Sequence, residues 1–198
     1  MLRDVPDYPE IHVETRAEWR RWLGQHHGEH SGAWAITWRK SAERPAPTYD
    51  ELVEEALCVG WVDSTGRAID DERTALRFTP RKRGSGWAGT NKDRVAGLSA
   101  AGLMLPAGTA AVESAQADGS WSRLDEAEKG IVPDDLGRAL DERPPARSEF
   151  EAFPPSVRRG ILQWIVAAKR AETRARRIRE TAELAARGER ANQWRPKS

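Results

Sequence analysis

The amino-acid sequence predicts an α+β fold, with a small, mostly antiparallel sheet covered by helices and an all-helical C-terminal half. Strands are expected near residues 33–39, 60–64 and 66–79. Two observations support the sheet: apolar residues alternate at strand positions, and helix-capping sequences stand before and between those positions. After residue 105 the apolar residues suit helices, and prolines stand where helices would begin.

Capping boxes begin the first two predicted helices. In Thr15–Glu18 and again in Thr48–Glu51, the threonine can accept from a first-turn N–H while the glutamate reaches back to the threonine N–H. The first helix is expected to run to about Gln25. The second carries a broad apolar stripe and ends at Gly60, where a C-cap glycine is expected.

The strand predictions depend on alternation and on a turn sequence. Trp34, Ile36 and Trp38 fall on one face of the first strand. Strand, helix and strand then follow within about 30 residues, the minimum for a crossover connection. Residues 66–79 are typical of a hairpin whose turn is Asp70–Arg73.

The rest of the chain is predicted to be helical after a basic, glycine-rich loop at residues 80–89. Thr90 suits a helix N-cap, and proline is tolerated in a first helical turn. The expected helices run over 90–101, from Pro106 to near Gly119, from Pro133 to near Arg143, and from about Arg170 to Gly188. Residues 120–132 are expected to form an irregular connector, and the segment after Pro155 is apolar enough to be buried.

The length of 198 residues suits one domain over residues 1–188. We expect a sheet-bearing part at 15–104, a helical part at 105–188 and a flexible tail at 189–198. The net charge of +1 argues against a general attraction to nucleic acid or anionic membranes. The sequence shows no signal peptide or membrane span, and its single cysteine suits a reducing compartment, so a cytoplasmic protein without a membrane partner is expected.

Nine tryptophans, against three phenylalanines and two tyrosines, are the most unusual feature of the composition. Indole rings combine bulk with an N–H donor, and arginine forks bind carboxylate or phosphate at two points. We therefore predict a pocket for an anionic or amphipathic small molecule or peptide. Its predicted ligand-binding residues are Trp34, Trp38, Trp61, Asp63, Arg67, Arg77, Thr79, Arg81, Ser85 and Trp87. In the structural alternative, Arg77 pairs with Asp63 to close the sheet edge.

Trp87 has a more specific prediction. Glycines at 84, 86 and 89 surround it, and glycine lowers the steric cost of loop motion. Its indole is expected to swing as a lid over the mouth of the pocket. In the alternative, Trp87 is fixed in the core and the glycines permit a tight turn.

Two other function classes remain open. An enzyme would use Asp63 as acid or base, with Arg77 or Arg81 stabilising a developing negative charge. A nucleic-acid-binding protein would need the basic residues 81–83 and the basic last helix to share one face. That helix also carries glutamates, and its arginines spread around the axis, which favours a solvated face.

The histidines and the cysteine favour structural roles. His26 and His30 have the four-residue spacing of metal ligands on a helix, but Glu29 is the one well-placed carboxylate near them. A solvated helix end is favoured over a metal site, and no metal or cofactor is predicted. Cys58 lies on an apolar stripe without a histidine close in sequence, so it is expected to be a buried core residue.

A set of segments occurs in a distinctive order. They are Ser31–Trp34, Tyr49–Asp63, Arg77–Arg81, Ser85–Trp87, Gly102–Met104, Ala111–Gly119 and Ala168–Ile178. Through these segments the chain, over about residues 15–188, resembles the YdeI/OmpD-associated, or bacteriocin-protection, family.

The resemblance implies a bacterial cytosolic protein connected with tolerance of antimicrobial peptides or with accessory metabolism. The family has no generally agreed reaction, so the resemblance transfers no catalytic residue and the ligand-binding residues remain those predicted from the sequence. Such sequences often have a second aromatic or basic residue near position 88. This chain has Ala88-Gly89, which predicts a more open pocket.

Overall fold

The computed structural model describes residues 8–193, which divide into two compact units. The first unit consists of residues up to Ser85 and of Thr90–Asp118, and the second consists of Gly86–Gly89 and the residues from Gly119 onward. The predicted α+β class is confirmed. All described strands lie in the first unit, and the second is helical. One domain over residues 1–188 stays a prediction.

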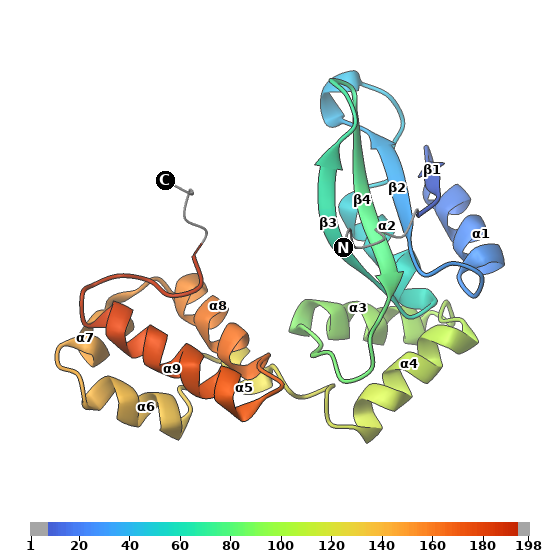
Figure 1. The fold of residues 1–198 in the computed structure, drawn as a ribbon. Coiled ribbons are helices and arrows are strands. Elements are labelled where there is room, and N and C mark those ends of the chain that lie inside the picture. Colours follow the sequence, from blue (N-terminus) through green and yellow to red (C-terminus); the bar gives the residue numbers. More distant parts are fainter. Residues whose placement is uncertain (1–7, 194–198) are drawn as a thin grey trace, which may run out of the picture. The chain divides into compact units, whose positions relative to one another are not determined.

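A four-stranded mixed sheet forms the centre of the first unit (Figure 1). Its strands are β1 (Glu10–His12), β2 (Ala33–Trp38), β3 (Trp61–Ala68) and β4 (Arg73–Pro80). Their order is β1-β2-β4-β3, with β1 parallel to β2 and the other two pairs antiparallel. The parallel strands β2 and β3 therefore do not pair directly, because β4 lies between them.

The predicted hairpin forms, with different strand boundaries. β3 does not end near residue 64 but continues to Ala68, with a register shift between Asp63 and Gly66 that absorbs an extra residue. The turn occupies residues 69–72, one residue earlier than the predicted Asp70–Arg73, because Arg73 already belongs to β4. β1 was not predicted, because its three residues are too few to show an alternating pattern.

The helices of the first unit follow their predicted starts closely. They are α1 (Arg16–His26), α2 (Tyr49–Cys58), α3 (Gly89–Ala100) and α4 (Pro106–Ala117), with a short 3-10 turn, η1 (Lys40–Ala42). Both capping boxes form. The backbone N–H groups of Glu18 and Glu51 each donate to the hydroxyl oxygen of the cap threonine, at a distance of 3.2 Å.

Helices α1 and α2 cover one face of the sheet. Trp19 of α1 is fully buried, with its ring 5.3 Å from that of Phe78 on β4, and its indole N–H donates to the Leu52 carbonyl of α2. Trp22 of α1 meets the buried Trp61 of β3 edge to face at 6.2 Å. These aromatic contacts supply much of the apolar burial that holds the helices to the sheet.

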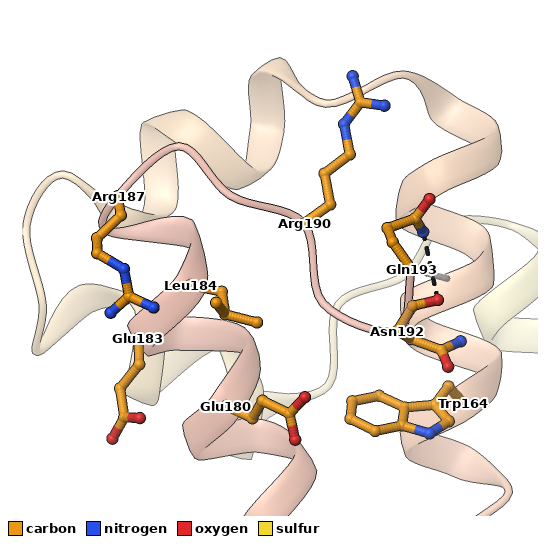
Figure 2. A pocket seen from close by; sticks show the side chains of 8 residues that line it. All are labelled: Trp164, Glu180, Glu183, Leu184, Arg187, Arg190, Asn192 and Gln193. Atoms are coloured by element: carbon orange, nitrogen blue, oxygen red, sulfur yellow. Dashed lines mark hydrogen bonds between the residues drawn. The ribbon is translucent and has the colours of Figure 1, made fainter. Parts of the chain in front are cut away.

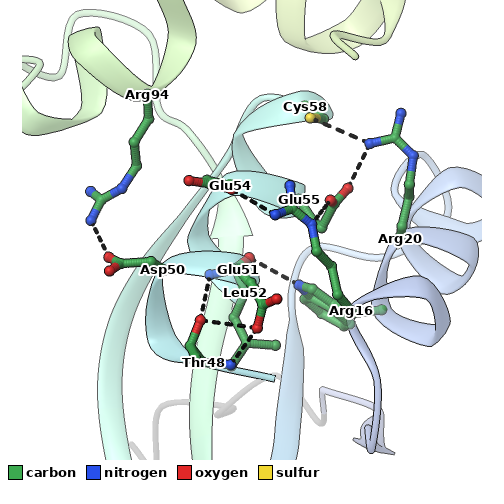
Figure 3. A network of polar contacts seen from close by, with 11 residues as sticks. Arg16, Arg20, Thr48, Asp50, Glu51, Leu52, Glu54, Glu55, Cys58 and Arg94 are labelled. Carbon is green, nitrogen blue, oxygen red and sulfur yellow. Dashed lines mark hydrogen bonds and ion pairs between the residues drawn. The ribbon is translucent and has the colours of Figure 1, made fainter. Parts of the chain in front are cut away.

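A buried carboxylate joins α1 to α2 (Figure 3). The Glu55 side chain is 2% exposed and accepts from Arg16 Nε at 2.5 Å and from Arg20 Nη1 at 2.6 Å. Arg20 also donates to the Leu103 carbonyl at 3.0 Å, which ties in the chain between α3 and α4. A charge so deeply buried is tolerated because both of its oxygens are hydrogen-bonded to cations.

The end of α2 lies very close to α4. Gly60 adopts φ +75° as the predicted C-cap glycine, and a Cβ there would lie 2.9 Å from the Ala111 Cβ. A Cβ on Gly108 of α4 would lie 2.3 Å from the Cys58 carbonyl oxygen, a distance no side chain can occupy. The two glycines thus let the helices pack backbone against backbone.

The second unit is a cluster of five described helices. They are α5 (Asp125–Glu128), α6 (Asp134–Asp141), α7 (Ala146–Ala152), α8 (Pro155–Val166) and α9 (Ala171–Ala185). Its core is built from fully buried aliphatic and aromatic side chains, including Leu136, Leu140, Phe150, Ile161, Leu162 and Ile165. Two short helices were not predicted: α5 lies inside the expected irregular connector, and α7 has too few residues for a clear apolar period.

Part of the predicted tail packs into this core. Ala191 is 1% exposed and belongs to the same apolar cluster. Residues 194–198, the last half of the predicted tail, lie outside the described residues. Over residues 8–193, no helix combines the length and apolar character that crossing a membrane requires.

The Glu55 network predicts a measurable loss of stability. Glu55→Gln should lower the free energy of unfolding by about 2–3 kcal/mol, less than for a fully buried pair because the arginines are partly exposed. Glu54→Gln is the matched control, since Glu54 pairs with Arg16 at 2.9 Å near the surface, at 28% exposure. Denaturant unfolding followed by circular dichroism measures both variants. Equal losses in the two would show that burial of Glu55 adds nothing.

Cys58 is buried as predicted, and this has a chemical consequence. Burial, together with the negative charge of Glu55, raises the pKa of the thiol, while the nearby Arg20 guanidinium partly opposes the shift. A raised pKa means less thiolate at any given pH. We expect a thiol reagent at pH 8 to label the native protein far more slowly than the unfolded protein. Fast native labelling would contradict the buried placement.

Candidate binding face

The second face of the sheet carries tryptophans and arginines. Strand alternation places Trp34 and Trp38 on the side away from α1 and α2, because Phe78 and Trp61 point to the helices. The β2–β4 register then sets Arg77 opposite Trp34 and Arg73 opposite Trp38. We call this surface the Trp/Arg face. Its members are Trp34, Trp38, Arg44, Arg67, Arg73 and Arg77.

Two arginines flank Trp34. The Arg67 guanidinium carbon lies 4.5 Å from the centre of the indole ring, and that of Arg77 lies 5.7 Å away. Arg67 is ion-paired with Glu10 of β1. Arg77 instead donates to the Ser64 hydroxyl at 2.9 Å and, at 3.4 Å, to the hydroxyl of Thr65. Within residues 8–193, Arg77 has no carboxylate at ion-pair distance.

Trp38 has a matching pair of arginines. The Arg44 guanidinium carbon lies 4.3 Å from the ring centre and that of Arg73 lies 5.9 Å away. Arg73 is ion-paired with Asp70 at 2.6 Å, and its hydrogen bond lowers the pKa of the Asp70 carboxyl. Arg44, like Arg77, has no carboxylate partner in the described part of the chain.

The two clusters therefore have the same composition, a tryptophan with two arginines beside it. Among the described residues, each tryptophan has one arginine that is ion-paired with a carboxylate and one that is not. Because Trp34 and Trp38 are four residues apart on a strand, the clusters lie about 13 Å apart. Guanidiniums over an indole face stay accessible to anions, and each can bind a carboxylate or phosphate at two points. The face can hold two anionic groups at that separation.

The structure brings half of the predicted ligand-binding residues onto one surface. Trp34, Trp38, Arg67 and Arg77 belong to the Trp/Arg face, and Thr79 shares its side of β4 because it stands two residues after Arg77. The other predicted residues lie elsewhere. They are Trp61, Asp63, Arg81, Ser85 and Trp87.

Asp63 and Arg77 point to opposite sides of the sheet. Asp63 stands opposite Phe78 in the register, on the helix side, and accepts a 2.9 Å hydrogen bond from Tyr49 of α2. Burial raises the pKa of Tyr49, and the hydrogen bond to Asp63 adds to that shift. The predicted alternative of an Asp63–Arg77 ion pair is therefore wrong. A catalytic pair of Asp63 and Arg77 at one substrate also does not form, whereas the pairing of Asp63 with Arg81 stays a prediction.

Arg81 and Ser85 belong to the loop after β4. Burial lowers the pKa of Arg81 to about 10, while the negative charge of Asp63 acts in the opposite direction. The backbone N–H of Arg81 donates to the Gly60 carbonyl at 2.9 Å, which holds the loop at the end of the sheet. Ser85 closes a turn through its hydroxyl, which donates to the Lys82 carbonyl at 2.7 Å. Neither residue lies in the strands of the Trp/Arg face.

Trp87 is not a mobile lid. Its side chain is 1% exposed and lies 4.9 Å from the Trp121 ring within the second unit. The neighbouring glycines allow close packing instead of motion. A Cβ on Gly86 would lie 2.7 Å from Leu124 Cγ, and the Gly89 N–H donates to Glu128 at 2.9 Å. The core alternative for Trp87 is the one that the structure supports.

Two members of the Trp/Arg face were missed from the sequence. Arg73 was assigned to the hairpin turn, whereas it is the first residue of β4 and stands opposite Trp38. Extending the predicted hairpin pairing by one strand residue would have found it. Arg44 lies in the loop after η1, and no sequence pattern indicated that it would return to Trp38.

A separate groove of about 680 Å³ lies in the second unit (Figure 2). Its lining residues are Trp164, Glu180, Glu183, Leu184, Arg187, Arg190, Asn192 and Gln193. Figure 2 shows carboxylates and guanidiniums distributed around its walls. Because both signs of charge are present in equal number, the groove favours no particular ligand charge.

The nucleic-acid alternative needed basic groups from both units. Residues 81–83 belong to the first unit and α9 to the second. On α9, Arg174 is already bound to Asp135 through two hydrogen bonds of 2.7 and 2.9 Å. Arg177 donates to the Trp164 carbonyl and lies over its ring at 4.8 Å. These two arginines stabilise the helical unit instead of facing a ligand.

Two family models match different parts of the chain. Residues 11–111 match a family described as a domain of unknown function (DUF8412). Residues 129–188 match the family described as bacteriocin-protection, YdeI or OmpD-associated. No curated protein and no solved structure matches the chain.

The resemblance inferred from the sequence is confirmed, at residues 129–188. The motifs before residue 105, which had carried most of that resemblance, lie in the other match. The bacteriocin-protection match lies entirely within the second unit. Because the residue 11–111 match spans just over half of the 198 residues, the chain belongs to the family of this domain of unknown function, and it carries a bacteriocin-protection, YdeI or OmpD-associated domain in its C-terminal part.

Proposed function

We propose that the Trp/Arg face binds an extended, anionic or amphipathic molecule, with an acidic peptide as the best-fitting ligand. The observation that supports this is the repeated cluster: each tryptophan lies beside one arginine that has no carboxylate partner among residues 8–193. The neutralised arginines keep the indole rings in place, and the other two offer positive charge to a ligand.

The spacing favours a peptide in extended conformation. An extended chain advances about 3.3 Å per residue, so about four residues span the distance between the clusters. Side chains four residues apart in an extended chain also point to the same side. A peptide with two acidic residues in that spacing could reach Arg77 and Arg44 together.

For the cellular role, the bacteriocin-protection match supports a general proposal and no specific pathway. A protein that carries a bacteriocin-protection domain and holds peptides fits an accessory function in antimicrobial tolerance or metabolism in a bacterial cytoplasm. Both the role and the compartment are part of the proposal. Its motivation is the domain match at residues 129–188 together with the reducing compartment suggested by the single cysteine.

The proposal is tested by removing the charges of Arg44 and Arg77, which no carboxylate of the described segment neutralises. A labelled peptide with glutamates four residues apart should bind the full chain, measured by fluorescence polarisation. Arg44→Gln and Arg77→Gln should each weaken binding roughly tenfold, about 1.4 kcal/mol, because each removes one charge-assisted contact. Raising the salt concentration should weaken binding further.

Arg21→Gln is the control for that experiment. Arg21 is an exposed arginine of α1, the helix that covers the other side of the sheet, so its loss should leave peptide affinity unchanged. If Arg21→Gln weakens binding as much as Arg77→Gln does, the effect is one of net charge. Binding of a single-stranded oligonucleotide but of no acidic peptide would replace the proposal with base stacking on the tryptophans. A fall in melting temperature without loss of affinity would make Arg77 structural.

A further inference from the structure

Three potential metal ligands meet at the end of α1. His26, Glu29 and His30 each offer one ligand atom, and these atoms all lie within 4.8 Å of one another. His26 Nδ1 and Glu29 Oε2 are already in hydrogen-bond contact at 2.8 Å. The cluster lies outside the Trp/Arg face, since α1 covers the opposite side of the sheet.

We propose that His26, Glu29 and His30 form a binding site for a divalent transition-metal ion, with Zn²⁺ as the reference ion. Imidazole nitrogens and a carboxylate oxygen are the ligand types that zinc takes in proteins. Two histidines and one glutamate supply three ligands, which leaves a coordination position open to water or to another ligand. The carboxylate also offsets part of the charge of the cation.

The local backbone explains why these residues meet. α1 ends at His26, and the chain then turns so that the Glu29 N–H donates to the His26 carbonyl at 3.0 Å. This turn returns Glu29 and His30 to the side of the helix where His26 lies. Because His30 lies beyond the end of α1, it is this turn and not the helix period that brings His30 and Glu29 to His26.

Trp22 orients both imidazole rings. It stacks against His30, with ring centres 5.8 Å apart and planes 15° apart, and lies 5.4 Å from the His26 ring. Trp22 itself stacks on the buried Trp19 at 5.4 Å with an interplanar angle of 4°. The two imidazole rings thus pack against Trp22, which is itself held by the buried Trp19. This packing restricts the rings before an ion binds, so less side-chain entropy is lost on binding.

Small movements suffice to close the site. With metal–ligand bonds of about 2.0–2.1 Å, neighbouring ligand atoms in a tetrahedral site lie about 3.3 Å apart. The His26–Glu29 pair is already closer than that, at 2.8 Å, and would open slightly to admit the ion. The Glu29 side chain is 64% exposed and that of His26 38%, so side-chain rotation can make these adjustments.

His27 supplies an internal control. It is the neighbour of His26, but its Nδ1 contacts the Leu23 carbonyl at 2.8 Å and it does not belong to the cluster. A site built from this particular geometry should ignore His27. Weak, unspecific binding by surface histidines would instead fall when His27 is removed as well.

The experiment titrates the 198-residue chain with Zn²⁺ alone, in competition with a chromophoric chelator at pH 7.5. The wild type should bind one equivalent. His26→Ala, His30→Ala and Glu29→Gln should each bind at least about tenfold more weakly, the loss typical of removing even an outer-shell partner of a metal ligand. His27→Ala should bind like the wild type, and circular dichroism checks that every variant is folded.

A second measurement uses the fluorescence of Trp22, which contacts both histidine rings. Cu²⁺ bound at the cluster should quench the fluorescence of Trp22, so the quenching should shrink in Trp22→Phe, which keeps a flat ring beside the histidines. The proposal is overturned if the wild type binds no Zn²⁺, if a cluster variant binds as tightly as the wild type, or if His27→Ala weakens binding equally. None of these outcomes bears on peptide binding at the Trp/Arg face.

Discussion

The buried carboxylate of Glu55 is the interaction on which the first unit depends. It sits at 2% exposure between two arginines of α1, so the helix pair α1–α2 cannot slide without breaking two charge-assisted hydrogen bonds. Through Arg20 and the Leu103 carbonyl, the same network reaches the segment between α3 and α4. Apolar packing alone would tolerate several helix positions, whereas a buried ion pair favours one.

Fixing the helices on one side of the sheet determines what the other side can do. The large aromatic residues Trp19, Phe78 and Trp61 are used for packing on the helix side. On the Trp/Arg face, the tryptophans are stacked with arginines, so their rings are partly shielded without becoming core. Strand alternation places Phe78 and Trp61 on the helix side and Trp34 and Trp38 on the other side, while Trp19 reaches the packed side from α1.

The sequence predicted local features well and tertiary placement less well. Thr15 and Thr48 cap as expected, because a capping box involves only neighbouring residues. The side of the sheet on which Asp63 lies depends on the irregularity in β3, which no local pattern indicates. Trp87 was misjudged because its glycines suit either a hinge or a tight contact, and the contact with Leu124 comes from a distant segment. The potential ligand Glu29 was noticed in the sequence, but the turn that completes its cluster could be seen only in the structure.

The positions of the two family matches show that the bacteriocin-protection match does not cover the Trp/Arg face. The bacteriocin-protection match lies in the helical unit, whereas Trp34, Trp38 and their arginines lie in the domain of unknown function. Arg174 and Arg177 of the helical unit are engaged in internal contacts, so that unit offers less available positive charge than its sequence suggests. The proposed ligand binding would therefore be a property of the N-terminal domain. Chains that share only the C-terminal domain should lack that binding, because they do not supply the sheet on which the tryptophans and arginines meet.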